Sequence, residues 1–424
     1  MAKSFQNIWN SQWKNTLLMA ASSGIGQIIS FLLLPILGRI FSPEEFNEFS
    51  LIYAWIIPLS ILSTLKIELA IPQCTDLKEK YHVTRMALFS SIVQTLLLFI
   101  PITLWNLVFD GAIQWYYLPV GVLSFSIPQI LNILVTSVNE YSKSSWYRII
   151  NNLSLQLFSA LFGYIGWGGQ GLILGFIIGQ LMGAIILMKG HFKTLFNQDF
   201  LSIQLSDFKR FSSYIRYSMP QGIIETLQLS GTITILSYLF GNPVPGIYYL
   251  TWRILQAPIT MISNSVFVVQ YNRCMSLKNA GLSYSNTLKK NFLILLIPGI
   301  FMGAFLMWSG PMIFEWFLGS QHRPSGEMAK FLAPWFIFQF CVSPFSFVAL
   351  IENEQKKSLM LNLIDFLLKT TGLVIGYYLN QLETGLILYS AFSCILLIYS
   401  YFWYYRLSKL SFSKVSSDLF LTTK

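Results

Sequence analysis

Residues 170–189 read QGLILGFIIGQLMGAIILMK, with no charged side chain before Lys189. A run of about 20 apolar residues is the length that an α-helix needs to cross the hydrocarbon core of a bilayer. Glycines recur every four residues from Gly171 to Gly183, so they share one helical face on which another backbone can approach closely. The stretch predicts a membrane-spanning helix with a tight packing face, called the glycine seam below.

The composition of the whole chain agrees with a membrane protein. Its 424 residues are 54% hydrophobic and 11% charged, whereas about a quarter of the residues of a soluble domain are charged. The net charge of +10 would suggest nucleic acid in a soluble protein. Here the basic residues lie in short segments between apolar runs, so they indicate membrane orientation and no nucleic-acid partner.

Apolar runs of spanning length recur along the chain and predict an all-α integral membrane protein of about twelve helices. No cleavable signal peptide is expected before the first run. The predicted spans are 15–38, 46–72, 86–108, 114–138, 147–167, 170–189, 219–241, 246–271, 291–309, 328–351, 358–379 and 383–405.

The distribution of Lys and Arg predicts the orientation of these spans. Of the 28 basic residues, Arg39 and Arg323 fall in segments on one side of the membrane, and four fall inside predicted spans. The remaining 22 fall on the side that holds the N-terminus. Because cytoplasmic loops are enriched in Lys and Arg, both termini are predicted to be cytoplasmic. The protein is expected in the bacterial inner membrane.

The longest inner connection divides the chain into two six-helix bundles, residues 1–190 and 219–424. Within the connecting residues 191–218, apolar side chains follow a helical period and alternate with basic ones. Such a segment is either an amphipathic helix on the inner leaflet or a solvated linker. The apolar side chains are Phe208, Phe211, Tyr214 and Ile215, and the basic ones are Lys209, Arg210 and Arg216.

The two halves show a weak internal similarity. Residues 35–55 and 234–254 align without a gap, with four identities that include Phe41 and Phe240. Both stretches leave one helix at the outer surface and enter the next. Repeats of equal topology predict a parallel duplication about an axis along the membrane normal.

Charged residues inside the spans are the main candidates for function, because a charge at the bilayer centre costs about 3 kcal/mol or more. Asp365 and Lys369 are four residues apart, so they can pair on one helical face. Either they form a structural ion pair, or Lys369 is a cavity cation for substrate and Asp365 couples transport to an ion. Arg253 is a second candidate cation for phosphate, unless it snorkels to the interface or pairs with a carbonyl.

Two further carboxylates are candidates for ion coupling. Glu225 lies in the seventh span without an opposite charge nearby in sequence, and it either takes up a cation or is a hydrogen-bonded polar residue between helices. Glu68 lies two residues after Lys66 near the inner end of the second span, where Lys66 can snorkel to the interface.

The sequence gives little support for enzyme chemistry, a metal site or a cofactor. The three histidines are far apart in sequence, and the four cysteines form no CxxC pair. No phosphate-binding glycine loop or nucleophile elbow occurs. No soluble domain is large enough for an ATPase, so active transport would draw on a proton or sodium gradient or on substrate consumption elsewhere.

Two stretches of the first half resemble the motifs of Wzx-type polysaccharide flippases. Residues 33–46 read LLPILGRIFSPEEF, with Pro35, Arg39 and Pro43 at motif positions. Residues 65–72 read LKIELAIP, with Lys66 where the family often has Arg. The second half is similar at Leu239-Phe240-Gly241, Gly246-Ile247-Tyr248, Arg253 and Pro258. The chain departs from the family at Gly38 and Asn47 as well as at Lys66.

The resemblance implies a member of the multidrug/oligosaccharidyl-lipid/polysaccharide exporter superfamily, with two six-helix bundles. It implies flipping of an undecaprenyl-pyrophosphate-linked oligosaccharide by alternating access, for O-antigen or another surface polysaccharide. Other assembly proteins, such as a polysaccharide polymerase, are then expected partners. Two alternatives stay open: an ion-coupled small-molecule exporter of the same superfamily, and a membrane-embedded glycan polymerase or ligase.

Overall fold

Each of the twelve predicted spans is helical in the computed structural model, which describes residues 2–109, 113–196 and 205–421. The described ranges contain no strand. The helices of the first part of the chain are α1 (Ala2–Ile40), α2 (Pro43–Thr64), α3 (Leu77–Phe109), α4 (Tyr117–Ser137), α5 (Tyr141–Tyr164) and α6 (Gly168–Met188). They are followed by α7 (Phe192–Leu195), α8 (Leu205–Arg210), a π-helical turn at Tyr214–Ser218, α9 (Met219–Thr226) and α10 (Ser230–Phe240).

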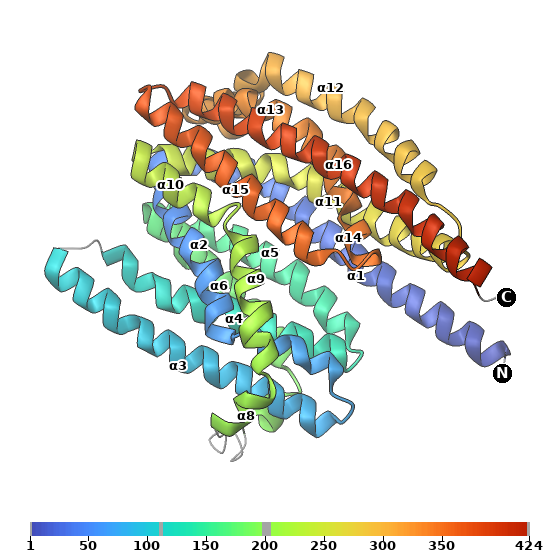
Figure 1. The fold of residues 1–424 in the computed structure, drawn as a ribbon. Coiled ribbons are helices and arrows are strands. Elements are labelled where there is room, and N and C mark those ends of the chain that lie inside the picture. The colour runs from blue at the N-terminus through green and yellow to red at the C-terminus, as the bar shows by residue number, and fades with distance from the viewer. Residues whose placement is uncertain (1, 110–112, 197–204, 422–424) are drawn as a thin grey trace. The chain divides into compact units, whose positions relative to one another are not determined.

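The remaining helices complete the fold (Figure 1). They are α11 (Val244–Asn279), α12 (Ser285–Leu318), α13 (Arg323–Val342), α14 (Phe347–Ile351), α15 (Gln355–Tyr378) and α16 (Leu382–Leu421). Among the described residues, nine helical stretches are long and apolar enough to cross a membrane. A tenth span is made by two helical segments with a bend between them, Tyr214–Thr226 and Ser230–Phe240. Helices α5 and α11 have 24 and 36 residues and a more polar composition, and with them the predicted count of twelve is confirmed.

The chain forms two compact units, Met1–Thr234 and Ile235–Lys424. In the first unit α5 packs against α1 and α6, while α4 packs against α2, α3 and α6. In the second unit α13 packs against α11, α12 and α16, and α15 packs against α16. The border between the units falls inside α10.

Helix α2 begins where the sequence motif SPEEF places a helix start. Ser42 is the N-cap, and its Oγ accepts from Glu45 N at 3.3 Å while Glu45 Oε2 accepts from Ser42 N at 2.7 Å. This reciprocal capping box satisfies two backbone donors that a helix start otherwise leaves unpaired. Pro43 follows at the first helical position, where the missing N–H costs nothing.

Three predicted spans are not continuous helices. The second span ends at Thr64, because Leu65 and Lys66 adopt left-handed backbone angles (φ +54° and +57°), and Ile67–Gln73 is a 3₁₀-helix. The seventh bends by 48° between α9 and α10, where Thr226 Oγ1 bonds back to the Ile223 carbonyl in a manner that bends helices. The tenth is interrupted by a 3₁₀ turn at Ser343–Ser346 that contains Pro344.

The apolar side chains of the connecting segment pack against protein. Phe211 is buried, and Phe208, Tyr214 and Ile215 lie against the same core cluster of the first unit, which includes Val83. These side chains therefore bury apolar surface against the first unit, and the amphipathic helix on the inner leaflet stays a prediction. Residues 197–204 of the segment lie outside the described residues.

The predicted glycine seam is confirmed on the face of α6 that meets α5. A Cβ on Gly179 would lie 2.7–2.8 Å from the Cβ, Cα and N of Leu155, and a Cβ on Gly175 would lie 2.5 Å from the backbone N of Ser159. Real Cβ atoms essentially never come so close to another heavy atom. The two helices can therefore pack at this distance only because these positions have no side chain.

The helix pair α15–α16 repeats the pair α5–α6 at a constant offset of 214 residues. Asn139 and Asn353 both adopt left-handed angles before the first helix of each pair, and Gly166 and Asn380 do so after it. Helices α5 and α15 each have 24 residues. These matched turns support the internal duplication that the sequence predicts.

The shorter alignment of the two halves also has a structural counterpart. A Cβ on Gly163 would meet the ring of Phe41, and Phe240 makes an edge-on contact with the ring of Tyr377. Tyr377 lies 214 residues after Gly163, and Phe240 is the residue that the sequence aligns with Phe41. The same pair of helices therefore meets at the same point in each unit.

Gly179→Ala is expected to lower the stability of the protein by about 1–3 kcal/mol, because the added methyl group overpacks the seam against the backbone of α5. The melting temperature of the full chain in detergent measures the effect. Gly24→Ala in α1 is the matched control, since nothing lies within 4 Å of its Cβ position and alanine favours a helix. Equal melting temperatures for the two variants would contradict the seam.

Candidate functional site

Lys369 and Asp365 form an ion pair near the middle of α15. The Lys369 Nζ lies 2.6 Å from Asp365 Oδ2, and the lysine residue is only 4% exposed. Their i, i+4 spacing places both side chains on one face, as the sequence predicts. A buried charge with a partner at this distance is neutral as a pair, which is the condition for keeping it inside a membrane-spanning bundle.

Two aromatic rings from other helices enclose the lysine. The Lys369 Nζ lies 5.3 Å from the ring centroid of Trp335 on α13 and 5.2 Å from that of Tyr389 on α16. At such distances the face of each ring attracts the cation. The Tyr389 hydroxyl is hydrogen-bonded to the Tyr248 hydroxyl of α11 at 2.9 Å. Four helices of the second unit therefore contribute to one site.

Serines of α16 fix the ion pair and one of the rings. Ser393 Oγ donates to Asp365 Oδ1 at 2.7 Å, and the Trp335 backbone N–H donates to Ser390 Oγ at 2.9 Å. Pro334 precedes Trp335 inside α13, and a proline at this place disturbs the helical hydrogen bonds around it. The residues joined by these contacts are called the Lys369 cluster below: Lys369, Asp365, Trp335, Tyr389, Tyr248, Ser390 and Ser393.

The repeat shows that the charges of the Lys369 cluster belong to the second unit alone. At an offset of 214 residues, Asn151 corresponds to Asp365 and Leu155 to Lys369. Asn151 Nδ2 donates to the Gly179 carbonyl of α6 at 3.1 Å, and Gly179 corresponds to Ser393. The contact between α5 and α6 is thus made by neutral side chains. The packing of two helices in this way does not require an ion pair.

Arg253 lies on α11, partly buried, and its side chain is hydrogen-bonded to Tyr249 one turn earlier. Tyr249 is itself buried and follows Tyr248 of the Lys369 cluster in sequence. The second candidate cation therefore lies on the same helix as one member of the cluster. The Tyr249 hydroxyl is neutral, so this hydrogen bond does not neutralise the charge of the Arg253 guanidinium.

The other two candidate carboxylates differ in environment. Glu225 is exposed on α9 and accepts from Gln221 Nε2 at 3.2 Å. Glu68 is 4% exposed, and its Oε2 atom has no hydrogen-bond partner among the described residues. A buried carboxylate oxygen without a partner costs free energy.

The motif residues of the first unit have structural positions. Pro35 lies inside α1, and Arg39 is exposed in its last turn, where a basic side chain suits the helix dipole. Lys66 holds one of the left-handed positions that end α2, and its side chain passes close to Gly222 of α9. A Cβ at Gly222 would come within 2.9 Å of Lys66 Cε.

The described part of the chain offers no group of three His, Cys, Asp or Glu side chains that could hold a metal ion. Its charged clusters consist of one or two acids with basic and aromatic partners.

A family of polysaccharide biosynthesis proteins has a model that matches residues 12–271, which is more than half of the chain. The chain belongs to this family. The match covers the motif residues Pro35, Arg39, Pro43 and Lys66 as well as Arg253. No curated protein sequence matches the chain.

Solved structures similar to this family member are transporters of the MOP superfamily. An inward-facing multidrug resistance MATE family transporter has a TM-score of 0.70 at 14% identity and covers 91% of this chain and 95% of its own. The lipid II flippase MurJ, in an inward closed conformation, has a TM-score of 0.72 at 14% identity over 96% and 93%. A MOP superfamily transporter from Pyrococcus furiosus has a TM-score of 0.62 at 15% identity over 94% and 96%. These likenesses show the twelve-helix fold.

Lys369→Met is expected to destabilise the protein by about 3–5 kcal/mol, because it leaves Asp365 as a buried charge without its partner. The double change Asp365→Asn with Lys369→Leu copies the residues of the first unit and is expected to recover most of this loss. Melting temperatures of the full chain in detergent measure both effects. A double variant as unstable as the single one would contradict the equivalence of the two helix pairs.

Proposed function

We propose that this protein is a flippase for lipid-linked oligosaccharides, with undecaprenyl-pyrophosphate-linked repeat units as substrate, in a pathway for O-antigen or another surface polysaccharide. Membership of a polysaccharide biosynthesis family supports a glycan substrate, and the MOP superfamily fold supports transport. The proposed membrane is the bacterial inner membrane, with both termini in the cytoplasm.

The observation that carries the proposal is the buried Lys369 cluster. A pyrophosphate needs cations in a site shielded from water, and a lysine amine held at depth provides one. The first unit has Leu155 at the equivalent position, so packing alone does not explain the lysine. Arg253, whose described hydrogen bond goes to a neutral hydroxyl, is proposed as a second phosphate-binding cation.

Ion-coupled export of a small molecule is the second candidate. The likeness to the MATE family transporter supports it as much as the likeness to MurJ supports flipping. Asp365, Glu225 and Glu68 are the proposed coupling carboxylates in either case. A glycan polymerase or ligase has less support, because the connection between α12 and α13 holds only the short turn Ser320–His322.

Lys369→Ala and the double variant Asp365→Asn with Lys369→Leu are expected to abolish surface glycan in a deletion strain that the wild-type gene complements. Lipid-linked repeat units are expected to accumulate on the cytoplasmic face. Arg253→Ala is expected to reduce surface glycan at least tenfold. Lys330→Ala is the control, because this exposed lysine lies on α13 outside the cluster. Blotting of surface glycan and of protein in the membrane fraction measures the outcomes.

Normal surface glycan in the stable double variant would refute a role of Lys369 in transport. Normal glycan in the deletion strain, together with increased drug sensitivity, would favour the small-molecule exporter. The double variant is the most informative of the set because its expected stability separates loss of transport from loss of fold.

The proposed orientation predicts that a cysteine at Asn242 reacts with a membrane-impermeant maleimide in intact cells, whereas a cysteine at Ala280 reacts only after lysis. Both positions are exposed, and the four native cysteines are buried, so the background labelling is low. The reverse labelling pattern would overturn the proposed orientation. The predicted outer loop near residues 109–113 lies largely outside the described residues.

A further inference from the structure

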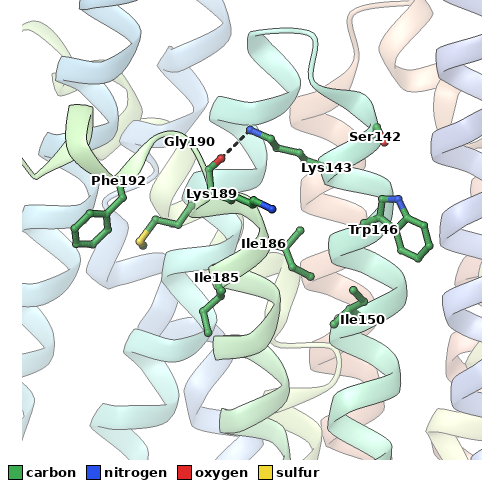
Figure 2. Close-up of a pocket in the computed structure, with 10 residues that line it drawn as sticks. Ser142, Lys143, Trp146, Ile150, Ile185, Ile186, Lys189, Gly190 and Phe192 are labelled. Atoms are coloured by element: carbon green, nitrogen blue, oxygen red, sulfur yellow. Dashed lines mark hydrogen bonds between the residues drawn. The ribbon is translucent and has the colours of Figure 1, made fainter.

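A groove lies between the ends of α5 and α6 that adjoin the connecting segment (Figure 2). Its volume is about 640 Å³, within the range of about 300–1,000 Å³ typical of small-molecule sites. Ile150 of α5 and Ile185 and Ile186 of α6 line it, and Lys189 and Trp146 lie at its mouth. The groove runs beside the glycine seam, which closes at Gly183 against Tyr147.

The apolar lining is exposed rather than covered by the protein. Ile185 is 64% exposed and Trp146 is 57% exposed. On a spanning helix such side chains lie against lipid acyl chains, and tryptophan prefers the level of the headgroups. The groove therefore joins an apolar wall at acyl-chain depth to a mouth at headgroup depth.

The mouth carries a basic residue held in place by a hydrogen-bonded turn. Lys143 Nζ donates to the Lys189 carbonyl at 2.8 Å, as the dashed line in Figure 2 shows, and pairs with Glu140 Oε2 at 2.7 Å. The same carboxylate oxygen lies 2.9 Å from His191 Nε2. This network fixes the chain reversal at Gly190 (φ +88°) and thereby places Lys189 at the groove.

The charge balance at the mouth is positive. Burial raises the pKa of Glu140, but hydrogen bonds from Lys143 and His191 outweigh burial and hold it below its usual value. The Glu140 carboxylate is thus already paired with Lys143 and His191. The exposed Lys189 takes part in no ion pair among the described residues, and the exposed Lys193 follows four residues later.

The second unit has aromatic rings at the equivalent positions. Lys357, Tyr399 and Trp403 lie 214 residues after Lys143, Ile185 and Lys189. The Lys357 amine lies 4.9 Å from the ring centroid of Trp403 and 5.9 Å from that of Tyr399. The first unit thus has Ile185 and Lys189 at the positions where the second unit has two aromatic rings beside a lysine.

We propose that this groove binds an anionic phospholipid of the surrounding leaflet, with an acyl chain along Ile150, Ile185 and Ile186 and the phosphate at Lys189. Basic pockets between spanning helices bind anionic lipid headgroups in this way. The exposed Ser142 hydroxyl, which also lines the groove, supplies a neutral donor for the phosphate. This site is separate from the Lys369 cluster, which lies in the other unit.

Native mass spectrometry of the full chain with phosphatidylglycerol or phosphatidylcholine of identical acyl chains tests the proposal. The wild type is expected to retain more phosphatidylglycerol than phosphatidylcholine. Lys189→Gln is expected to weaken that retention about fivefold, the size of one lysine contact at an anionic surface. Ile185→Tyr, which copies the second unit, is expected to reduce the retention of both lipids by filling the groove.

Lys357→Gln is the matched control, since it removes one positive charge at the equivalent place of the second unit and is expected to leave retention unchanged. Equal retention by the wild type and Lys189→Gln would overturn the proposal, and so would an equal loss in Lys357→Gln. Preferential retention of a polyprenyl-linked oligosaccharide over phosphatidylglycerol would assign the groove to the transported substrate and also contradict it. Ile185→Tyr keeps the proposal testable if Lys189→Gln does not fold.

Discussion

The absence of water from the bilayer core is the constraint on which this structure depends. Every backbone N–H and C=O must be bonded within the protein, so each apolar run becomes a helix. The interruptions are therefore informative. Leu65 and Lys66 end α2 in left-handed angles beside the buried Glu68, and the bend between α9 and α10 follows Glu225. Both breaks lie next to carboxylates that the sequence marks as candidates for ion coupling.

The duplicated helix pairs separate what the fold needs from what a function adds. Asn151 and Asp365 occupy equivalent positions and both bond to the next helix, at Gly179 and Ser393. Leu155 shows that an apolar side chain is sufficient where Lys369 stands. A buried ion pair that a neutral pair can replace adds little to stability, so packing alone does not account for its presence in one unit only.

The sequence predicted the helices and the Asp365–Lys369 pair because both depend on local spacing. Length and apolarity determine a span, and an i, i+4 spacing determines which side chains share a face. The rings of Trp335 and Tyr389 around Lys369 were missed because they come from two other helices, as was Tyr248, which bonds to Tyr389 from a third. The packing of Phe211 and its neighbours against the first unit was not predicted, because amphipathic spacing alone does not distinguish a lipid surface from an apolar protein surface.

The Lys369 cluster also constrains the proposed function through charge balance. Asp365 neutralises Lys369 in this structure, at 2.6 Å. A phosphate bound to the same amine would place two anions beside one buried cation, and like charges at this distance disfavour ionisation. On the proposed function, the contact between Asp365 and Lys369 must then open while substrate is bound. Release of the substrate lets the ion pair form again, so substrate and Asp365 would compete for one lysine.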